Sequence, residues 1–235
     1  YLTMTYESAT LTAVTQTTPT VKHFQFELEK SSWEFEPGQH TVLRFEDDGE
    51  EVERPYTMIN LPEKDKFALA IKKYPDGRAT PWIHERQPGD EIDFAEPSGN
   101  LKIKDYDKDV VFISTGTGAT PMYAMLRDYL KNGSGEAFYF HGEKTRETIL
   151  FKDELELLDT ENDDLEVFFS LTDEEWSGAQ GYVQEHVPEK LDSLEDKHFY
   201  ICGVPAMVVQ TEELLKEEGV EEERIITEGW ESDAV

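Results

Sequence analysis

The sequence predicts a β plus α/β fold, with an antiparallel β domain over residues 1–104 and a parallel-sheet α/β domain over residues 105–235. The first hundred residues contain short, often alternating segments rich in Val, Thr, Phe and Tyr, a pattern typical of an antiparallel sandwich or barrel. After about residue 108, continuous apolar strands alternate with helical segments, which indicates right-handed βαβ units around a parallel sheet. A chain of 235 residues accommodates two compact domains.

Six segments of the first domain have the length and composition of strands: residues 6–16, 21–28, 41–45, 54–60, 66–74 and 91–95. Thr-Pro, Pro-Gly and Asp-Gly pairs lie between them and mark the turns, because Gly and Pro interrupt regular structure. One short helix is expected over residues 80–87, where Pro81 is tolerated in the first turn.

The second domain alternates strands and helices. Strands are expected at residues 110–115, 137–141, 166–171, 198–203 and 224–227, and helices at 121–130, 149–158, 182–187 and 205–219. Because the strands are apolar throughout, both faces of their sheet are expected to be covered by helices.

Acidic residues dominate the charge, with 52 Asp and Glu against 22 Lys and Arg and a net charge of −30. This charge repels nucleic-acid phosphates, so we expect no nucleic-acid binding. The acidic residues are scattered, which indicates a solvated surface suited to a high-salt, halophilic cytoplasm, where salt screens the repulsion. An acidic protein of an ordinary cell is the alternative.

Other classes are excluded by what the sequence lacks. It has no long apolar run, so no membrane insertion is expected, and its first residues do not resemble a secretory signal, which predicts a cytoplasmic location. The single cysteine, Cys202, excludes an intrachain disulfide and a cysteine-ligated cluster. The six histidines show no metal-ligand spacing, so no metal site is predicted.

A glycine-rich turn, STGTGATP at residues 114–121, stands directly between an apolar strand and a helix. Glycines bring backbone N–H groups close to a phosphate, and the helix adds the partial positive charge of its N-terminus. Pro121 makes the spacing differ from G-x-G-x-x-G. We predict a phosphate site at Thr115, Gly116, Thr117, Gly118 and Pro121, with a purely structural turn as the alternative.

A second loop, CGVPAM at residues 202–207, ends the fourth strand of the parallel sheet. Ligands of open α/β sheets collect at the carboxyl ends of strands. Gly203 would let a ring approach closely, Cys202 could contact a nicotinamide, and Val204 and Pro205 complete the loop. Taken alone, the motif favours the alternative of a small buried cysteine before a structural loop.

The β domain carries a third motif, RPYTMIN at residues 54–60. The guanidinium of Arg54 keeps its charge and matches phosphate geometry. Tyr56 points to the same face of the strand as Arg54 and presents a flat ring for stacking, and Thr57 offers a hydroxyl and an amide. Taken alone, the motif favours an ordinary strand with a salt bridge.

The fourth motif, KKYPDGRATPW at residues 72–82, leads into the short helix of the β domain. Its candidate cofactor-binding residues are Lys73, Gly77, Arg78, Ala79 and Thr80. Thr80 is the expected N-cap, and the two basic residues bring positive charge to the same turn. A helix start with basic neighbours indicates an anion site, and simple capping is an equal alternative.

In this order and on these two folds, the four motifs resemble the ferredoxin–NADP reductase-like flavoproteins over roughly residues 5–230. The resemblance implies a six-stranded antiparallel barrel for FAD and a five-stranded parallel sheet for NADP or NAD. RPYT is similar to the family's Arg-x-Tyr-Ser/Thr motif. By that likeness Arg54 would hold the FAD pyrophosphate, Tyr56 would stack on the isoalloxazine and Thr57 would hydrogen-bond near flavin N5.

The other motifs have counterparts in the same family. PGQH (37–40) resembles its Pro-Gly-Gln segment, and GRAT (77–80) resembles the turn that holds the flavin pyrophosphate. TGTGATP is similar to the pyrophosphate loop of the nicotinamide dinucleotide, and CGVP to the loop that presents the nicotinamide to the flavin. HGEKTRETILFKDEL (141–155) is similar to the segment that recognises the adenosine end.

The implied reaction is hydride transfer between NAD(P)H and FAD, with single electrons exchanged with a partner. Candidate catalytic residues are Thr57 beside flavin N5, Cys202 beside the nicotinamide and Glu228 near the C-terminus. Trp230 is a candidate aromatic cover for the flavin, and a plain core or surface tryptophan is an equal alternative.

Two signals conflict on the nucleotide. Glu143, at the end of the second strand of the parallel sheet, favours a ribose diol and repels a 2′-phosphate, which points to NADH. Lys144 and Arg146 could bind that phosphate, which points to NADPH. We lean slightly to NADPH, because two bases stand together in a chain depleted of them; an exposed loop with ordinary charges is the alternative.

The resemblance thus implies an FAD-dependent reductase that exchanges electrons with ferredoxin or a similar carrier. That carrier would be a separate protein, because a plant-type cluster needs four cysteines. Two alternatives stay open: an NAD(P)H:flavin reductase, and a non-catalytic electron-transfer subunit of a larger complex.

Overall fold

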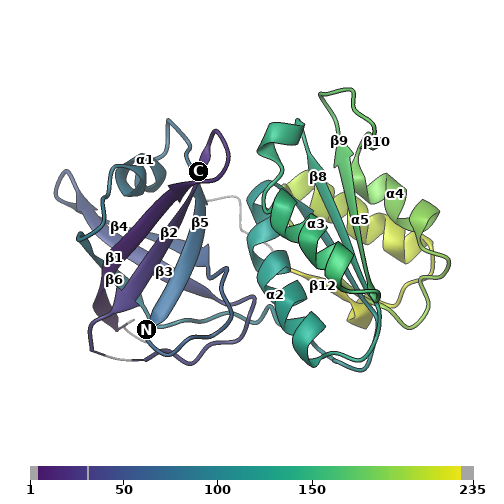
Figure 1. Ribbon diagram of the computed structural model, residues 1–235, viewed down its shortest axis with the longest axis horizontal. Helices are drawn as coiled ribbons and strands as arrows, with labels where there is room; N and C mark the ends of the chain where they lie inside the picture. Colours follow the sequence, from purple (N-terminus) through teal and green to yellow (C-terminus); the bar gives the residue numbers. More distant parts are fainter. Residues whose placement is uncertain (1–4, 31, 229–235) are drawn as a thin grey trace. The chain divides into compact units, whose positions relative to one another are not determined.

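The computed structural model describes residues 5–30 and 32–228, which form two compact units that divide in sequence between Lys102 and Ile103 (Figure 1). Unit 1 contains the described residues up to Lys102, and unit 2 runs from Ile103 to residue 228. Each unit has its own sheet, and the two sheets differ in strand direction.

Unit 1 is an antiparallel sheet of six strands in the order β4-β3-β6-β1-β2-β5. Past the end of β4, Met58 bridges to Leu69 of β5, so the two outer strands meet and the sheet forms a partly closed barrel. The elements are β1 (Tyr6–Gln16), β2 (Val21–Leu28), β3 (His40–Asp47), β4 (Glu50–Thr57), β5 (Lys66–Lys72), α1 (Ala79–His84) and β6 (Glu91–Ala95).

The core of unit 1 follows the two-residue period of its strands. On β2, Phe24, Phe26 and Leu28 are buried, and exposed polar residues stand between them. The Phe26 ring lies 5.0 Å from that of Phe67 and 4.8 Å from that of Phe94, measured between ring centroids. This aromatic cluster fills the inside of the barrel, which the alternating segments of the sequence predict.

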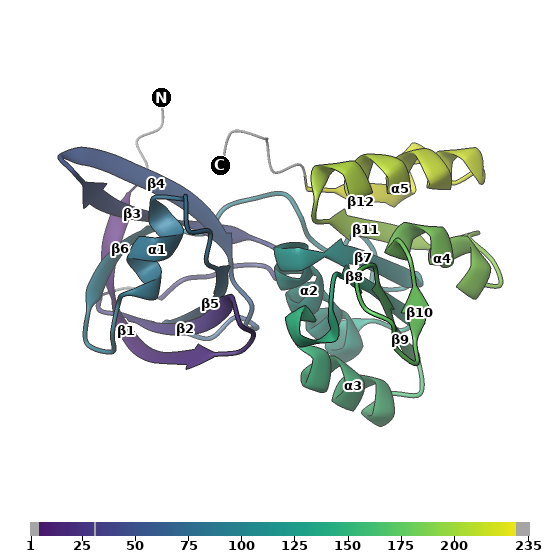
Figure 2. The ribbon, with the colours of Figure 1, turned by 90° about the horizontal axis from the view of Figure 1, so that it is seen from above.

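Unit 2 is a parallel sheet of six strands in the order β10-β9-β8-β7-β11-β12. Figure 2 shows three layers, with α2 and α3 on one face of the sheet and α4 and α5 on the other. The elements are β7 (Val110–Thr115), η1 (Gly116–Gly118), α2 (Ala119–Asn132), β8 (Ala137–Glu143), η2 (Arg146–Thr148), α3 (Lys152–Glu161), β9 (Leu165–Leu171), β10 (Ala179–Gln180), α4 (Val183–Lys190), β11 (His198–Cys202), α5 (Pro205–Glu217), η3 (Glu222–Arg224) and β12 (Ile225–Thr227), where η denotes a short 3-10 helix.

The central strand β7 is buried on both faces, as expected for a parallel strand between two helical layers. Val111 and Ile113 belong to the core cluster shared with α4 and α5. Phe112 points to the other face, where its ring lies 6.2 Å from that of Tyr139 and 5.4 Å from that of Tyr200. Two apolar cores therefore hold the strand that leads into the glycine-rich loop.

The predicted fold class is confirmed, with two local corrections. The parallel sheet has six strands where five were expected, because the two-residue strand β10 pairs with β9. The short helix α1 begins at Ala79 with Arg78 as its N-cap, so the expectation that Thr80 caps the helix is wrong. Thr80 lies inside the first turn, and its hydroxyl binds the main chain of Tyr74 instead.

Candidate functional site

The order of strands in unit 2 reverses between β7 and β11. From β7 the chain proceeds through β8 and β9 to β10 on one side, and it then returns to form β11 and β12 on the other. Open α/β sheets bind ligands at such a reversal, outside the carboxyl ends of the strands. Thr115 and Cys202 end the two strands that flank this point, which places both predicted loops at the same edge.

The glycine-rich loop after β7 is one short 3-10 turn that runs directly into α2. Gly118 is the N-cap of this 14-residue helix, and no side chain caps it. The first N–H groups of a helix have no partner within the helix, so they and the helix dipole favour an anion here. Thr120 and Pro121 are buried in the first turn of this helix.

The loops after β7 and β11 pack so closely that only glycine fits at the contact. A Cβ on Gly118 would lie 2.1 Å from the Cys202 carbonyl oxygen, and one on Gly203 would lie 2.3 Å from Thr115 Oγ1. Gly203 also has a φ of +153°. The Val204 N–H donates to Thr115 Oγ1 at 3.0 Å, which joins the two loops directly. Both loops therefore form one continuous main-chain surface at the reversal.

The Cys202 side chain is fully buried on this surface's inner side. Val204 and Pro205, which follow it, are exposed. The loop thus offers its main chain and these two residues to a ligand at the edge, whereas the thiol packs inside. The predicted role of Cys202 beside a nicotinamide stays a prediction.

The end of β8 presents a carboxylate held by its own loop. Glu143 Oε2 accepts hydrogen bonds from Thr148 Oγ1 at 3.1 Å and from the Lys144 N–H at 3.3 Å. Its side chain keeps 11% of its surface exposed. The Glu143 carboxylate is therefore ordered by nearby donors and still reachable from solvent.

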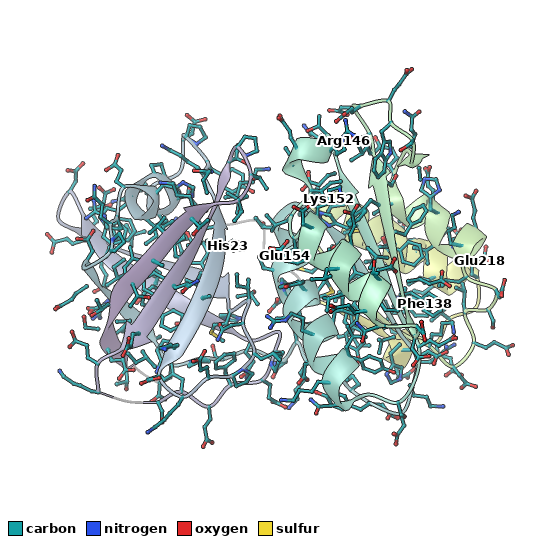
Figure 3. The ribbon with its side chains drawn as sticks, viewed as in Figure 1. His23, Phe138, Arg146, Lys152, Glu154 and Glu218 are labelled. Carbon is teal, nitrogen blue, oxygen red and sulfur yellow. The ribbon has the colours of Figure 1, made fainter. Side chains whose placement is uncertain are left out.

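Arg146 is paired with an acid in the same region. The Arg146 guanidinium lies 3.5 Å from Glu174 Oε1, and the main-chain N–H of Arg146 donates to Glu174 Oε2 at 2.7 Å. Figure 3 shows Arg146 at one end of unit 2 and Phe138, near the start of β8, at the opposite end. Arg146 thus follows the carboxyl end of β8, with its charge offset by Glu174.

Sequence reasoning missed an aromatic residue near this edge. Tyr182 is the N-cap of α4 and is 61% exposed. The next residue, Val183, packs so closely on Gly142 that a Cβ there would lie 2.9 Å from the Val183 Cβ. Tyr182 therefore stands near the end of β8, where its ring is available for stacking. Gly181 before this residue and the start of α4 after it were the features of the sequence that could have identified Tyr182.

In unit 1, the RPYT motif forms the end of β4. Thr57 is buried, and among the described residues its Oγ1 has no hydrogen-bond partner. An unsatisfied buried hydroxyl is costly, so it fits a site completed by a ligand. Tyr56 is half-buried, and burial raises the pKa of its hydroxyl, so the ring stays neutral.

The two predicted pyrophosphate arginines differ in their surroundings. Arg78 is held by the β3–β4 turn: its Nε lies 2.7 Å from Asp47 Oδ2 and its Nη1 lies 2.8 Å from Glu50 Oε2. Arg54 donates from Nη1 to the Glu53 carbonyl oxygen at 2.8 Å and forms no ion pair with the described residues. Arg54 is therefore the better placed of the two to meet an anion.

The loop before α1 is closed by its own main chain and by Thr80. Thr80 Oγ1 accepts from the Tyr74 N–H at 2.9 Å and donates to the Tyr74 carbonyl oxygen at 3.1 Å, and the Gly77 N–H donates to the same oxygen at 3.0 Å. Lys73 is exposed, and Ala79 is buried. The hydroxyl of Thr80 thus shapes the turn, and the cofactor contact expected of it stays a prediction.

Two predicted residues lie near the end of the chain. Glu228 follows β12, and its N–H donates to the Ile201 carbonyl oxygen at 3.3 Å, which places it beside β11. Trp230 lies outside the described residues.

Over residues 5–30 and 32–228, no group of three or more His, Cys, Asp or Glu side chains is placed to hold a metal ion. In the same part of the chain, no helix has the length and apolar character needed to cross a membrane.

Comparison with known proteins identifies both units. Residues 8–103 match the oxidoreductase FAD-binding domain, and residues 112–213 match the oxidoreductase NAD-binding domain. The ferredoxin–NADP reductase B of Sorangium cellulosum is 33% identical over 223 residues, which cover 89% of this chain and 91% of that protein. The matched regions contain all four motifs.

Two further relatives extend the comparison. The glycine betaine monooxygenase reductase subunit of Chromohalobacter salexigens is 32% identical over 79% of this chain, and the match spans only 53% of that protein. The structure of a ferredoxin NADP+ reductase from Neisseria gonorrhoeae with bound FAD and NADP has a TM-score of 0.84 at 22% identity, covering 95% of this chain and 98% of that one. At 22% identity, the likeness to the Neisseria gonorrhoeae structure shows the fold alone.

The two domain matches and the full-length relative agree with the sites built above: a dinucleotide edge in unit 2 and an unsatisfied threonine beside a half-buried tyrosine in unit 1. The chain therefore belongs to the ferredoxin–NADP reductase-like family of FAD- and NAD-binding oxidoreductases, and it is an FAD-dependent NAD(P)H oxidoreductase of that type.

Proposed function

We propose that the protein takes hydride from NADH onto its FAD and passes electrons to a separate carrier protein of the ferredoxin type. The FAD domain would comprise residues 1–104 and the nicotinamide domain residues 105–235. The bound flavin supplies the change from two-electron to one-electron chemistry. The chain's own residues bind and orient the two cofactors.

The observation that carries this proposal is the joined surface of the loops after β7 and β11. Gly118 and Gly203 remove side-chain bulk where main-chain groups line the reversal of strand order. The pyrophosphate would lie against Thr115–Gly118 at the start of α2, and the nicotinamide against the loop of Gly203, Val204 and Pro205.

The contacts of the β8 edge support NADH over NADPH. The ordered Glu143 carboxylate would accept hydrogen bonds from the adenosine ribose diol and repel a 2′-phosphate. The positive charge of Arg146, the strongest candidate for a phosphate contact, is offset by the carboxylate of Glu174. This preference reverses the slight leaning to NADPH that composition alone suggests. The exposed ring of Tyr182 would stack on the adenine.

In unit 1, the proposal assigns FAD contacts to the RPYT motif. Arg54 would pair with the flavin pyrophosphate, Tyr56 would stack on the isoalloxazine, and Thr57 would hydrogen-bond near N5. The unsatisfied Thr57 Oγ1 supports the last assignment. The turn at Gly77–Thr80 would contribute main-chain groups, while Arg78 holds that turn to the β3–β4 hairpin.

The ferredoxin-type partner is supported by the full-length relative, which is named a ferredoxin–NADP reductase. A second candidate role is supported by the relative whose length the chain only half spans, because that protein is a reductase subunit. In this role the chain would deliver electrons to a larger oxygenase-type partner.

The net charge of −30 supports a high-salt working environment, in which repulsion among surface acids is screened. Reduced nicotinamide dinucleotides are produced inside cells, which supports a cytoplasmic location.

Steady-state assays on the FAD-loaded protein test the proposed function. With NADH as donor, we expect turnover both with a one-electron dye and with a [2Fe–2S] ferredoxin. Turnover with the dye but not with any ferredoxin would contradict the carrier assignment. A rate that depends on added FAD, with release of reduced flavin, would identify a flavin reductase, and no dye turnover would identify a non-catalytic subunit.

A further inference from the structure

Strand register places three buried residues in one row across the parallel sheet. Cys202 of β11 is the register partner of Ser114 on β7, and Ser114 is the partner of His141 on β8. All three are fully buried. Register partners in a parallel sheet point to the same face, so the row runs from the predicted nicotinamide loop to the strand that ends at Glu143.

His141 is the polar centre of this row. Its Nδ1 lies 2.9 Å from Ser114 Oγ, and its Nε2 lies 3.9 Å from Glu143 Oε1. Among the described residues, Nε2 has no hydrogen-bond partner. His141 and Glu143 are two residues apart on one strand, so their side chains share a face.

The surroundings of the ring favour one tautomer. When the Ser114 hydroxyl donates to Nδ1, which lies 2.9 Å away, the ring proton is on Nε2. The carboxylate opposite Nε2 favours the same form, because the other tautomer would direct a lone pair at a negative charge. In this tautomer the Nε2–H group faces Glu143 Oε1, while Oε2 receives the Thr148 and Lys144 donors.

The ring also stays neutral. Burial lowers the pKa of His141 to about 4, so near pH 7 it adds no positive charge beside Glu143. A charged histidine would offset the carboxylate and weaken its repulsion of a 2′-phosphate. A neutral donor can orient the carboxylate and leave its negative charge intact.

We propose that His141 is a positioning residue for nucleotide selection, which holds the Glu143 carboxylate in the orientation that accepts the adenosine ribose. This role rests on the proposed function of Glu143. Gly142, between the two residues, is packed against Val183 and Thr115, so the strand end has little room to adjust when the histidine is changed.

The test measures equilibrium binding of NAD+ and NADP+ to the FAD-loaded protein by calorimetry. His141→Asn keeps a polar group near Nδ1 but removes the one facing Glu143, and we expect its preference for NAD+ to fall about fivefold. His141→Gln carries an amide N–H near the Nε2 position and is expected to stay within about twofold of the wild type. Ile113→Val, a fully buried change on the neighbouring strand β7 that lies in the core cluster on the other face, is the matched control and should leave the preference unchanged.

A double-mutant cycle separates this role from simple packing. If His141 acts through Glu143, His141→Asn has no effect on nucleotide preference in the Glu143→Gln background. An equal effect in both backgrounds, or none in either, overturns the proposal. If Glu143→Gln alone leaves the preference unchanged, the ribose assignment fails first, and the His141 role fails with it.

A measurement on the unmodified protein covers the case in which variants do not fold. The ring 15N chemical shifts of His141 report which nitrogen carries the proton. A proton on Nε2 at pH 7 supports the proposal, and a proton on Nδ1 overturns it.

Discussion

The Thr115 hydroxyl accepts a hydrogen bond from the Val204 N–H at 3.0 Å, and this contact joins the ends of β7 and β11 at the point where strand order reverses. Thr115 begins the glycine-rich loop, and Val204 lies in the loop predicted to present the nicotinamide. Two motifs separated by almost ninety residues in sequence therefore form one surface, and its geometry depends on glycines at both sides of the contact.

Gly118→Ala is expected to strain this surface. The new Cβ would lie 2.1 Å from the Cys202 carbonyl oxygen, so main chain must move, and we expect a loss of about 3 kcal/mol in the free energy of unfolding. Gly116→Ala in the same loop is the control. Its Cβ meets nothing within 4 Å, so it carries only the cost of a φ of +55°, about 1 kcal/mol. Equal losses in denaturant unfolding would contradict the close-packing account.

Arg54 and Arg78 are expected to differ in their effect on FAD affinity. Arg54→Gln removes a guanidinium that forms no ion pair with the described residues, and we expect FAD binding to weaken about tenfold or more. Arg78→Gln removes one already held by Asp47 and Glu50, so its effect should be smaller. Fluorescence titration of apoprotein with FAD measures both, and a larger loss for Arg78→Gln would contradict the assignment.

The free energy of unfolding is expected to decrease as the pH is lowered, and part of this decrease comes from His141. The pKa of His141 is about 4 when folded, below its ordinary value near 6.5, so the unfolded chain binds the proton more tightly in this window. The stabilisation is complete above about pH 6.5 and is lost as pH falls toward 4. Between pH 7 and pH 5, the wild type should lose about 2 kcal/mol more than His141→Gln. Urea unfolding at constant salt measures this difference, and parallel losses in both proteins would contradict it.

Salt is expected to stabilise the fold. With 52 acidic and 22 basic residues, surface repulsion is strong at low ionic strength, and screening shortens from about 10 Å at 0.1 M to about 3 Å at 1 M. The midpoint of thermal unfolding should therefore rise with KCl. Sucrose, which stabilises without screening, is the control. An unfolding midpoint that does not change with KCl would count against the high-salt environment.

Most of the fold could be predicted from sequence because each unit has an unambiguous period. β1, β2, β6 and β7 begin and end where alternation and turn residues place them. The predicted start of α1 was wrong because Thr80, a residue type favoured at N-caps, hydrogen-bonds through its hydroxyl to the main-chain N–H and carbonyl oxygen of Tyr74 instead. β10 was missed because two residues carry no period.

The site could be predicted only as far as local motifs reach. RPYT, TGTGATP and CGVP identify the segments, but long-range partners decide what each side chain does. Arg78 is held by residues about thirty positions earlier, and Arg146 by Glu174, so their pairing left no local signal. The row of Cys202, Ser114 and His141 depends on strand register, which sequence does not supply.

The most direct test of the reductase account is anaerobic titration of the FAD-loaded protein with NADH, followed by visible absorption. The account predicts that the flavin bands bleach at about one NADH per flavin, and that NADPH bleaches them only at higher concentration. Retained flavin that neither nucleotide reduces, or no retention of FAD after reconstitution, would contradict the central claim.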